Sequence, residues 1–369
     1  MNRSLRNYLR RRGATPAEIT KAESEERLAL LALDRQLLPG QARFTFAEAA
    51  TRAGLDVDVA RRLWRALGFP DLPDDARRFS DTDIDALITL QRRFASSLLG
   101  GTDPNQAALV QYVRVIGGSL AKIAEVQSDQ VVKAIRAARD TGLTDEQVAE
   151  LVPEAVDWER MSRLTDYGLR LQLRAALWRK LAAEGGSGVG AEPLSVGFVD
   201  LVGYTALSQE LEPEELGALV TRFEELAYDT VAEHGGRVVK TIGDEVMFVA
   251  DEASAAARIA LRLTQSSAVD DILPDARAGL DWGEVLAQEG DYYGPVVNLA
   301  SRLVEIARPG SVLASSAVHE ALDEHPSFGW DRLRSRRIRD IGRIEIWKLE
   351  RADDTNPGNH EGSGTVRSS

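Results

Sequence analysis

Two aspartates in the second half of the chain follow apolar runs that have the pattern of β-strands. Asp200 closes the run VGFVD, and Asp244 lies in the turn of VVKTIGDEVMF. If the two strands are neighbours, the carboxylates converge, and such oxygens suit Mg²⁺, which keeps positions open for substrate phosphates. Two metal ions held in this way are the usual arrangement for in-line phosphoryl chemistry. On spacing alone an ordinary turn aspartate is the more common explanation, so both explanations stay open.

A second polar pair lies on a predicted helix in the run GDYYGPVVNLASRL. Asn298 and Arg302 are four residues apart, so they share one helix face, while the apolar residues between them supply the buried side. An amide and a guanidinium directed at one point suit a ribose and a phosphoryl oxygen. Asp291 comes seven residues before Asn298 in a glycine-rich turn, where it could accept a hydrogen bond. A solvated polar stripe is the alternative that spacing alone favours.

The elements that would position these residues fall in two halves. Before the Gly- and Ser-rich run EGGSGVGAEP, at 184–193, the pattern is helical, and after it short strands alternate with helices. The helices predicted in the first half span 15–38, two segments within 46–69 that meet at Gly54, 80–99, and two or three more within 104–183, the last from Trp158 to Leu181. Ala50, Leu55, Val59 and Leu63 are the predicted core of the segment 46–69.

The second half is predicted to be a sandwich of helices on a mostly antiparallel sheet. The predicted strands are 194–199, 238–241, 246–250 and 277–286, with further strands after the last helix. The predicted helices are 214–231, 253–267 and 295–306. The fold class is therefore α+β, with an all-α first domain, and the polar end of the chain, 351–369, is predicted to be a disordered tail.

Composition excludes several classes of protein. The 369 residues include no cysteine, so disulfides and zinc–thiolate sites are excluded. The net charge is −13; residues 1–185 carry 28 basic and 26 acidic side chains, and the remainder carries 17 and 32. This acidic second half argues against nucleic acid as a partner. No apolar run approaches the roughly 20 residues of a transmembrane helix, and no secretory signal is present, so we expect a cytoplasmic protein.

Residues 44–95 resemble the helix-turn-helix of MerR-type regulators. The resemblance is carried by the run FTFAEAATRAGLDVDVARRLWRALGF and by the segment RRFSDTDIDALITLQ that follows it. The window holds 8 basic and 9 acidic residues, whereas DNA binding needs several cations on one face. A helical packing module is the favoured interpretation, and a DNA-binding regulator is kept as an alternative.

Four segments together resemble the class III nucleotidyl cyclase catalytic domain, over 194–350. They are FVDLVGYT, KTIGDEVMF, ARAGLDWGEV and GDYYGPVVNLASRL, in this order. The resemblance implies a ferredoxin-like α/β sandwich that converts ATP to 3′,5′-cyclic AMP and pyrophosphate. The alternative is a catalytically silent nucleotide-binding regulator. One departure is the run GLDWG at 279–283, where many relatives read Gly-x-His-x-Gly.

The resemblance also implies a role for each matching residue. Asp200, Asp244 and the backbone of Leu201 would bind two Mg²⁺ or Mn²⁺ ions per site. Lys240 would donate to adenine N1 and Asp291 would accept from its N6 amine, which agrees with their hydrogen-bonding chemistry. Asn298 would orient the ribose, and Arg302 would stabilise charge on the α-phosphoryl group. The residues expected at the triphosphate are Gly203, Tyr204, Thr205, Arg277 and Arg343.

In this family one chain supplies the metal aspartates of a site and the other supplies the purine, ribose and transition-state residues. The sequence carries both sets, so a symmetric homodimer with two equivalent sites is expected. The helical half, 1–183, is similar to the regulatory domain of pH-responsive mycobacterial cyclases. All four histidines follow the segment 184–193, so a histidine switch within the helical half is excluded. A small-molecule or lipid effector in that half stays open.

Overall fold

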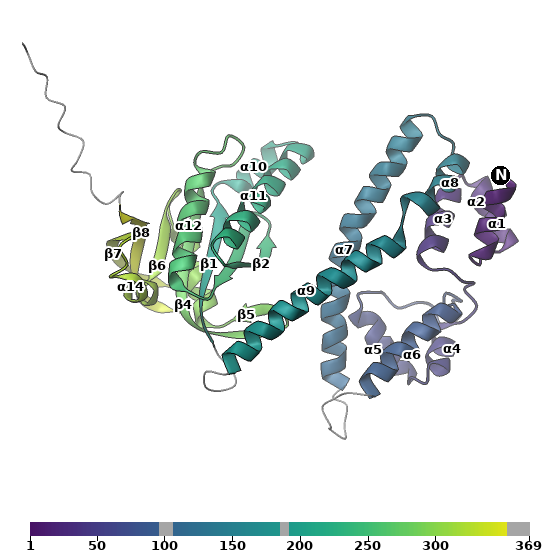
Figure 1. Cartoon of the computed structure of the whole chain (residues 1–369), viewed down its shortest axis with the longest axis horizontal. Helices are drawn as coiled ribbons and strands as arrows, with labels where there is room; N and C mark the ends of the chain where they lie inside the picture. The colour runs from purple at the N-terminus through teal and green to yellow at the C-terminus, as the bar shows by residue number, and fades with distance from the viewer. Residues whose placement is uncertain (96–105, 185–191, 353–369) are drawn as a thin grey trace, which may run out of the picture. The chain divides into compact units, whose positions relative to one another are not determined.

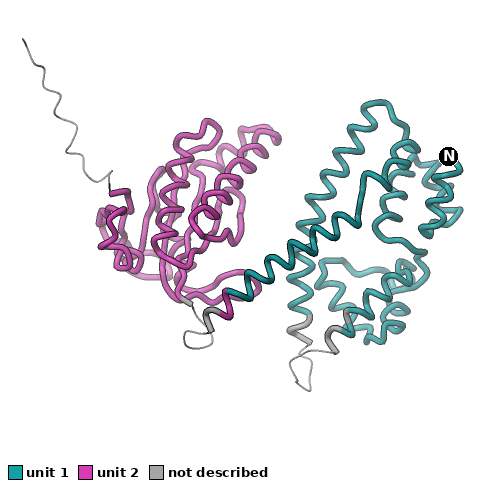
Figure 2. Tube along the Cα trace, viewed as in Figure 1, with its two compact units in different colours: residues 1–178 teal, residues 179–369 magenta. Residues whose placement is uncertain are grey.

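The computed structural model describes residues 1–95, 106–184 and 192–352. The chain divides into two compact units, residues 1–178 and 179–369 (Figure 2). Each unit has its own hydrophobic clusters. None of the helices in the described ranges has the length and apolar character needed to cross a membrane.

The first unit is built from helices, as the sequence predicts (Figure 1). They are α1 (Arg3–Arg11), α2 (Pro16–Ser24), α3 (Leu28–Leu37), α4 (Phe46–Arg52), α5 (Val57–Ala66), α6 (Asp81–Ala95), α7 (Gln106–Asp140), α8 (Asp145–Ala155) and α9 (Trp158–Glu184), which continues into the second unit. The last three confirm the prediction for 104–183. Residues 96–99 of the predicted helix 80–99 lie outside the described residues.

The single helix predicted over 15–38 is wrong, because the chain breaks between α2 and α3. Glu26 adopts a left-handed φ of 54°, and the Leu28 amide donates to the Asp145 carboxylate at 2.5 Å. The break turns α3 so that Ala29 and Ala32 pack with Val148 and its neighbours in α8. No glycine or proline marks this position, so tertiary packing overrides the local helical pattern.

Residues 44–95 form the predicted helix, turn and helix, followed by α6. Gly54 ends α4 with a φ of +71°, and Thr45 begins that helix with a capping box to Glu48. Of the predicted core, Ala50 and Leu63 are buried, and Leu55 and Val59 are half-buried. Leu63 also packs with Val113 of α7. The module therefore packs within the helical unit.

The second unit is a mixed sheet with helices on both faces. Its elements are β1 (Glu192–Leu201), α10 (Tyr204–Glu210), α11 (Pro213–Glu233), β2 (Arg237–Ile242), β3 (Glu245–Ala250), α12 (Ala253–Ser267), β4 (Ala276–Gln288), β5 (Asp291–Tyr293), α13 (Pro295–Ile306), β6 (Val312–Ser315), α14 (Ser316–Leu322), β7 (Phe328–Ile338) and β8 (Gly342–Arg351). The strand order is β2-β3-β1-β4-β6-β8-β7, and β5 pairs with the end of β4. Of these pairs, β4–β6 is parallel and the others are antiparallel.

Alternate residues of the strands separate two hydrophobic layers. Val199 and Phe248 pack with α11, α12 and α14, whereas Val196 and Phe198 pack with α13 on the other face. Asp200 has the parity of Phe198, so it lies on the α13 face at the end of β1. The strands therefore bring the candidate metal residue to the same side of the sheet as the helix that carries Asn298.

The domain boundaries differ slightly from the prediction. Glu192 and Pro193 belong to β1 and Glu184 belongs to α9, so the predicted linker 184–193 is structured at both ends, because strand pairing with β4 reaches Glu192. Likewise β8 continues through Arg351. The predicted linker centre, 185–191, and the rest of the predicted tail, 353–369, lie outside the described residues.

Candidate active site

The two candidate metal aspartates come together beside a basic residue. In the sheet register, Asp200 stands opposite Glu245 of β3 on one side and Arg277 of β4 on the other. Asp244 follows Gly243 in the β2–β3 turn, and its backbone carbonyl accepts from the Leu201 amide at 3.3 Å. Three strands therefore place these charged side chains in a row at one end of the sheet, as the sequence predicts for Asp200 and Asp244.

Arg277 neutralises part of this charge. Its Nε and Nη2 atoms lie 2.8 and 2.6 Å from Oδ2 of Asp200. Its Nη1 atom donates to the backbone carbonyl of Glu305, in the last turn of α13, at 3.1 Å. The guanidinium thus ties the strand end to α13, in a contact that the sequence pattern did not reveal.

The acidic groups repel one another. Burial, together with the neighbouring charge of Asp200, raises the pKa of Asp244 to about 6. Burial and the charges of Asp200 and Asp244 raise the pKa of Glu245 to about 7. Sequence reasoning missed Glu245, although its place next to Asp244 was a signal. The raised pKa values mean that the ionised carboxylates are destabilised here, and a bound cation would stabilise them.

The donor set fits magnesium better than a metal that needs an all-protein cage. Among the described residues no cluster of three or more His, Cys, Asp or Glu side chains has a metal-binding arrangement. Two carboxylates remain, and Mg²⁺ is commonly held by one or two carboxylates with substrate phosphates and water. Asp200 and Asp244, with the Leu201 backbone, are therefore the residues that would hold it.

The predicted purine-reading residues form a separate pair. Lys240 of β2 makes an ion pair with the Asp291 carboxylate at the start of β5. The other oxygen of Asp291 accepts from the Tyr292 amide at 2.8 Å, and Arg237 donates to the Tyr292 hydroxyl at 2.9 Å. Both charged groups stay partly exposed. A donor and an acceptor thus stand side by side at one position, as reading of an adenine edge requires.

The predicted ribose and phosphoryl residues lie on the exposed face of α13. Asn298 and Arg302 are exposed one turn apart, while Ala300 and Leu303 of the same helix are buried. The Arg302 guanidinium pairs with Glu305 at 2.5 Å. Gly279 lets α13 approach the sheet, since a Cβ there would meet the Ala300 carbonyl at 2.4 Å. A single glycine therefore sets the distance between the helix and β4.

The remaining predicted phosphate contacts are more scattered. Gly203 is the N-cap of α10, with a φ of +81°, and Tyr204 and Thr205 are the first two residues of that helix. Arg343 lies on β8 opposite Arg337, and both line a cavity of about 510 Å³. Two strands, β4 and β6, separate β8 from β1. Within one chain the structure does not bring Arg343 to Asp200.

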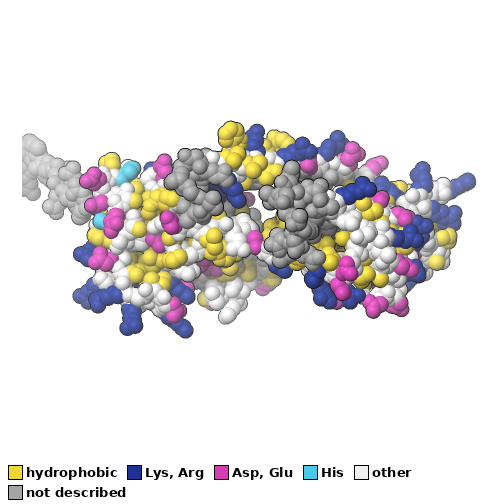
Figure 3. All heavy atoms as spheres, turned by 90° about the horizontal axis from the view of Figure 1, so that it is seen from below, with side chains coloured by type: hydrophobic (Ala, Val, Ile, Leu, Met, Phe, Trp, Pro, Cys, Tyr) yellow, Lys and Arg dark blue, Asp and Glu magenta, His cyan; other side chains and the backbone are white. Residues whose placement is uncertain are grey.

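Arg343 belongs to a basic group on the β7–β8 hairpin. Figure 3 shows Lys and Arg side chains gathered at the end of the second unit where these strands lie. The exposed arginines of this hairpin are Arg332, Arg334, Arg336, Arg337, Arg339, Arg343 and Arg351. This concentration stands out in a half of the chain that is acidic overall.

Comparison with known proteins decides the family. Residues 190–351 match the adenylate and guanylate cyclase catalytic domain, and residues 2–177 match the adenylate cyclase regulatory domain. An adenylate cyclase of Streptomyces coelicolor is 35% identical over 364 residues, which cover 92% of this chain and 93% of the relative. This chain belongs to the class III adenylate cyclases. The resemblances of the second half to the cyclase catalytic domain and of the helical half to a cyclase regulatory domain are thereby confirmed.

Further similarities cover either most of this cyclase or part of it. The pH-sensitive adenylate cyclase of Mycobacterium tuberculosis is 32% identical over 363 residues, covering 94% of this chain and 87% of the relative. The solved catalytic core of a rhodopsin-guanylyl cyclase in complex with ATPalphaS is 22% identical, with a TM-score of 0.42; the match covers 44% of this chain and 97% of that one. The helix-turn-helix-like segment 44–95 falls inside the regulatory domain.

The departure at Asp281 of the cyclase has a local explanation. This side chain is buried, and its Oδ1 accepts from the Ser315 hydroxyl at 2.5 Å and from the Trp282 amide at 2.8 Å. Burial raises the pKa of Asp281, although these two hydrogen bonds oppose the shift. Ser315 Oγ in turn accepts from the Val318 amide as the N-cap of α14. The aspartate therefore joins β4 to β6 and α14.

Proposed function

We propose that this cyclase converts ATP to 3′,5′-cyclic AMP and pyrophosphate in a homodimer with two composite sites. The supporting observation is the separation of two residue groups in one chain. Lys240 and Asp244 are four residues apart, yet Lys240 pairs with Asp291 whereas Asp244 approaches Asp200. Each chain thus offers one metal-binding half and one purine-binding half, and a second copy would complete both sites.

The purine would replace the existing contact between Lys240 and Asp291 with a hydrogen bond to each of them. Lys240 donates to adenine N1 and Asp291 accepts from the N6 amine, so the nucleotide replaces the contact between the two side chains. Guanine presents an acceptor at position 6, which would face the acceptor Asp291, and a donor at N1, which would face the donor Lys240. The pair therefore selects adenine over guanine.

Arg302 and Asn298 would act on the reacting end of the nucleotide. Asn298 holds the ribose so that its 3′-oxygen lies in line with the α-phosphorus. The 3′-hydroxyl loses its proton to solvent water, the O3′–Pα bond forms as the bond from Pα to the α–β bridging oxygen breaks, and pyrophosphate leaves with that electron pair. Arg302 stabilises the charge that develops on the α-phosphoryl oxygens.

The metal-binding half would complete this arrangement. When bound at Asp200 and Asp244, two Mg²⁺ or Mn²⁺ ions lower the pKa of the 3′-hydroxyl and neutralise phosphate charge. Arg277 would transfer its contact from Asp200 to the triphosphate, and Gly203, Tyr204 and Thr205 line the adjacent turn. Arg343 would reach the triphosphate from the partner chain. The helical domain would regulate catalysis by moving the two halves relative to each other.

A direct assay tests this function. Purified protein is incubated with ATP or GTP and Mg²⁺ or Mn²⁺, and the products are separated by chromatography. We expect cyclic AMP from ATP and little cyclic GMP from GTP. Cyclic GMP as the main product would overturn the assignment of Lys240 and Asp291. No cyclic product from a confirmed dimer would instead favour a silent nucleotide-binding regulator.

A further inference from the structure

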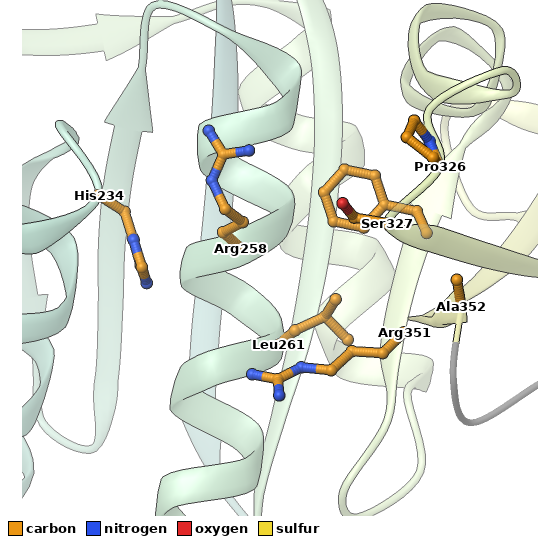
Figure 4. Close-up of a pocket in the computed structure, with 8 residues that line it drawn as sticks. His234, Arg258, Leu261, Pro326, Ser327, Arg351 and Ala352 are labelled. Carbon is orange, nitrogen blue, oxygen red and sulfur yellow. The ribbon is translucent and has the colours of Figure 1, made fainter.

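A second cavity of the catalytic unit lies on the face of the sheet opposite α13. It has a volume of about 390 Å³ and is formed by segments far apart in the sequence. His234 comes from the end of α11, Arg258 and Leu261 from α12, Phe328 from the start of β7, and Arg351 from the end of β8. Figure 4 shows Arg351 running beside Leu261, with Arg258 further along the same helix. This size is within the range of small-molecule sites.

The charge of this cavity is opposite to that of its surroundings. Among the described residues, its lining includes two arginines and a histidine and no carboxylate, in a half of the chain where acidic residues outnumber basic ones by 32 to 17. Across the described ranges, no ion pair involves Arg258, Arg351 or His234. Arg258 donates to the Ser254 hydroxyl at 3.2 Å, and that hydroxyl donates to the Glu252 carboxylate at 3.2 Å.

The floor of the cavity is apolar and well packed. Leu261 is 6% exposed and Phe328 is 8% exposed. The Ala352 amide donates to the Ser327 carbonyl at 3.1 Å, which fixes the end of β8 against the start of β7. Both walls that carry the arginines therefore belong to regular elements of the sheet unit. Guanidinium groups held on such elements recognise planar oxyanions by paired hydrogen bonds.

We propose that this cavity, lined by Arg258, Arg351 and His234, is a binding site for a small organic oxyanion of phosphate or carboxylate type. The apolar floor accommodates the organic part of the ligand. The site lies on the α11–α12 face, whereas Asp200 lies on the α13 face. An anion bound here leaves the proposed nucleotide site free, so both ligands bind at once.

Calorimetric titration of the full-length protein with inorganic phosphate, without metal, tests the proposal. The double variant Arg258→Gln with Arg351→Gln should weaken phosphate binding at least about 10-fold, because it removes two charged donors. The matched control is Arg262→Gln, an exposed arginine on α12 that does not line the cavity. It should stay within about twofold of the natural protein, as surface changes usually do. A parallel titration with succinate distinguishes a carboxylate site from a phosphate site.

A further variant distinguishes phosphate binding in this cavity from phosphate binding at the proposed catalytic centre. Arg277→Gln removes a triphosphate contact and should leave binding in this cavity intact. An unchanged affinity in the double variant, loss of binding in Arg277→Gln alone, or binding of neither anion would overturn the proposal. Thermal melting confirms the fold of each variant, and Arg351→Gln alone gives the same comparison if the double variant unfolds.

Discussion

At the scale of single residues, the roles of the candidate site positions stay predictions that the cyclase resemblance implies, and the structure adds their contacts. Asp244 lies near Asp200, and Lys240 pairs with Asp291. The partners that the same residues make in the free chain could not be predicted. The Arg277–Asp200 ion pair depends on a register between β1 and β4 that joins positions 77 residues apart.

Lys240 provides a test of purine recognition. Lys240→Met removes the donor to adenine N1 and should raise the KM for ATP about 10-fold or more, the cost of one charged hydrogen bond. Initial rates with ATP and Mg²⁺ measure this. Lys348→Met, at a lysine of β8 that pairs with Glu350, is the matched control. Equal KM values for the two variants would contradict the assignment.

Asp281 gives a prediction about stability and pH. Burial raises its folded-state pKa, so ionisation is less favourable in the folded than in the unfolded chain, where the pKa is about 3.9. The free energy of unfolding should therefore fall as pH rises from about 4 through the folded pKa. Asp281→Asn removes this ionisation. Urea unfolding should show the variant gaining stability relative to the natural protein between pH 4.5 and 7.5; a constant difference would contradict the account.

At the scale of elements, the sequence predicts most helices and strands, because their apolar periodicity is strong. The α2–α3 break is the exception, and it depends on α8, more than a hundred residues later in the chain. The distance between α13 and β4 also depends on a contact between residues that are far apart in the sequence. Gly279 belongs to the run GLDWG in the sequence, but its packing role appears only once α13 lies against it.

Gly279→Ala tests the close approach of α13. The added Cβ meets backbone atoms of Ala300 and Val304 at 2.4 Å, so the helix must shift, at about 1–3 kcal/mol of unfolding free energy. Because α13 carries Asn298 and Arg302, kcat should also fall. Chemical unfolding and turnover measurements report the two effects.

Gly217→Ala serves as the control for this substitution. Gly217 lies within α11, and an added Cβ there meets no atom within 4 Å. The exchange should leave kcat unchanged and should stabilise the protein by up to about 1 kcal/mol, since alanine has the higher helix propensity. Equal effects of the two substitutions would exclude a special role for the α13 contact.

At the scale of the whole molecule, the sequence predicts two domains and their families, because the Gly- and Ser-rich segment separates two different patterns. The proposed use of neighbouring residues in opposite sites does not follow from spacing. Lys240 and Asp244 lie on one hairpin, and their different partners in the fold support the proposal that they serve different sites. Under this proposal a second chain brings a metal-binding half to a purine-binding half.

The proposed composite sites predict a dependence of activity on protein concentration. Specific activity at saturating ATP should fall as the protein is diluted below the dissociation constant of the dimer, since a monomer holds two incomplete sites. Sedimentation at the same concentrations should show monomer appearing as activity is lost. Full activity of a species shown to be monomeric would be incompatible with composite sites.

Complementation between two inactive variants tests the central claim most directly. Asp200→Ala removes a metal ligand and Arg302→Ala removes the transition-state guanidinium, so each homodimer should be inactive. In an equal mixture, half of the dimers are mixed and each keeps one intact site, so the cyclic AMP formed should reach about a quarter of the natural activity. No recovery, in a mixture shown by tagged subunits to contain mixed dimers, would contradict sites shared between chains.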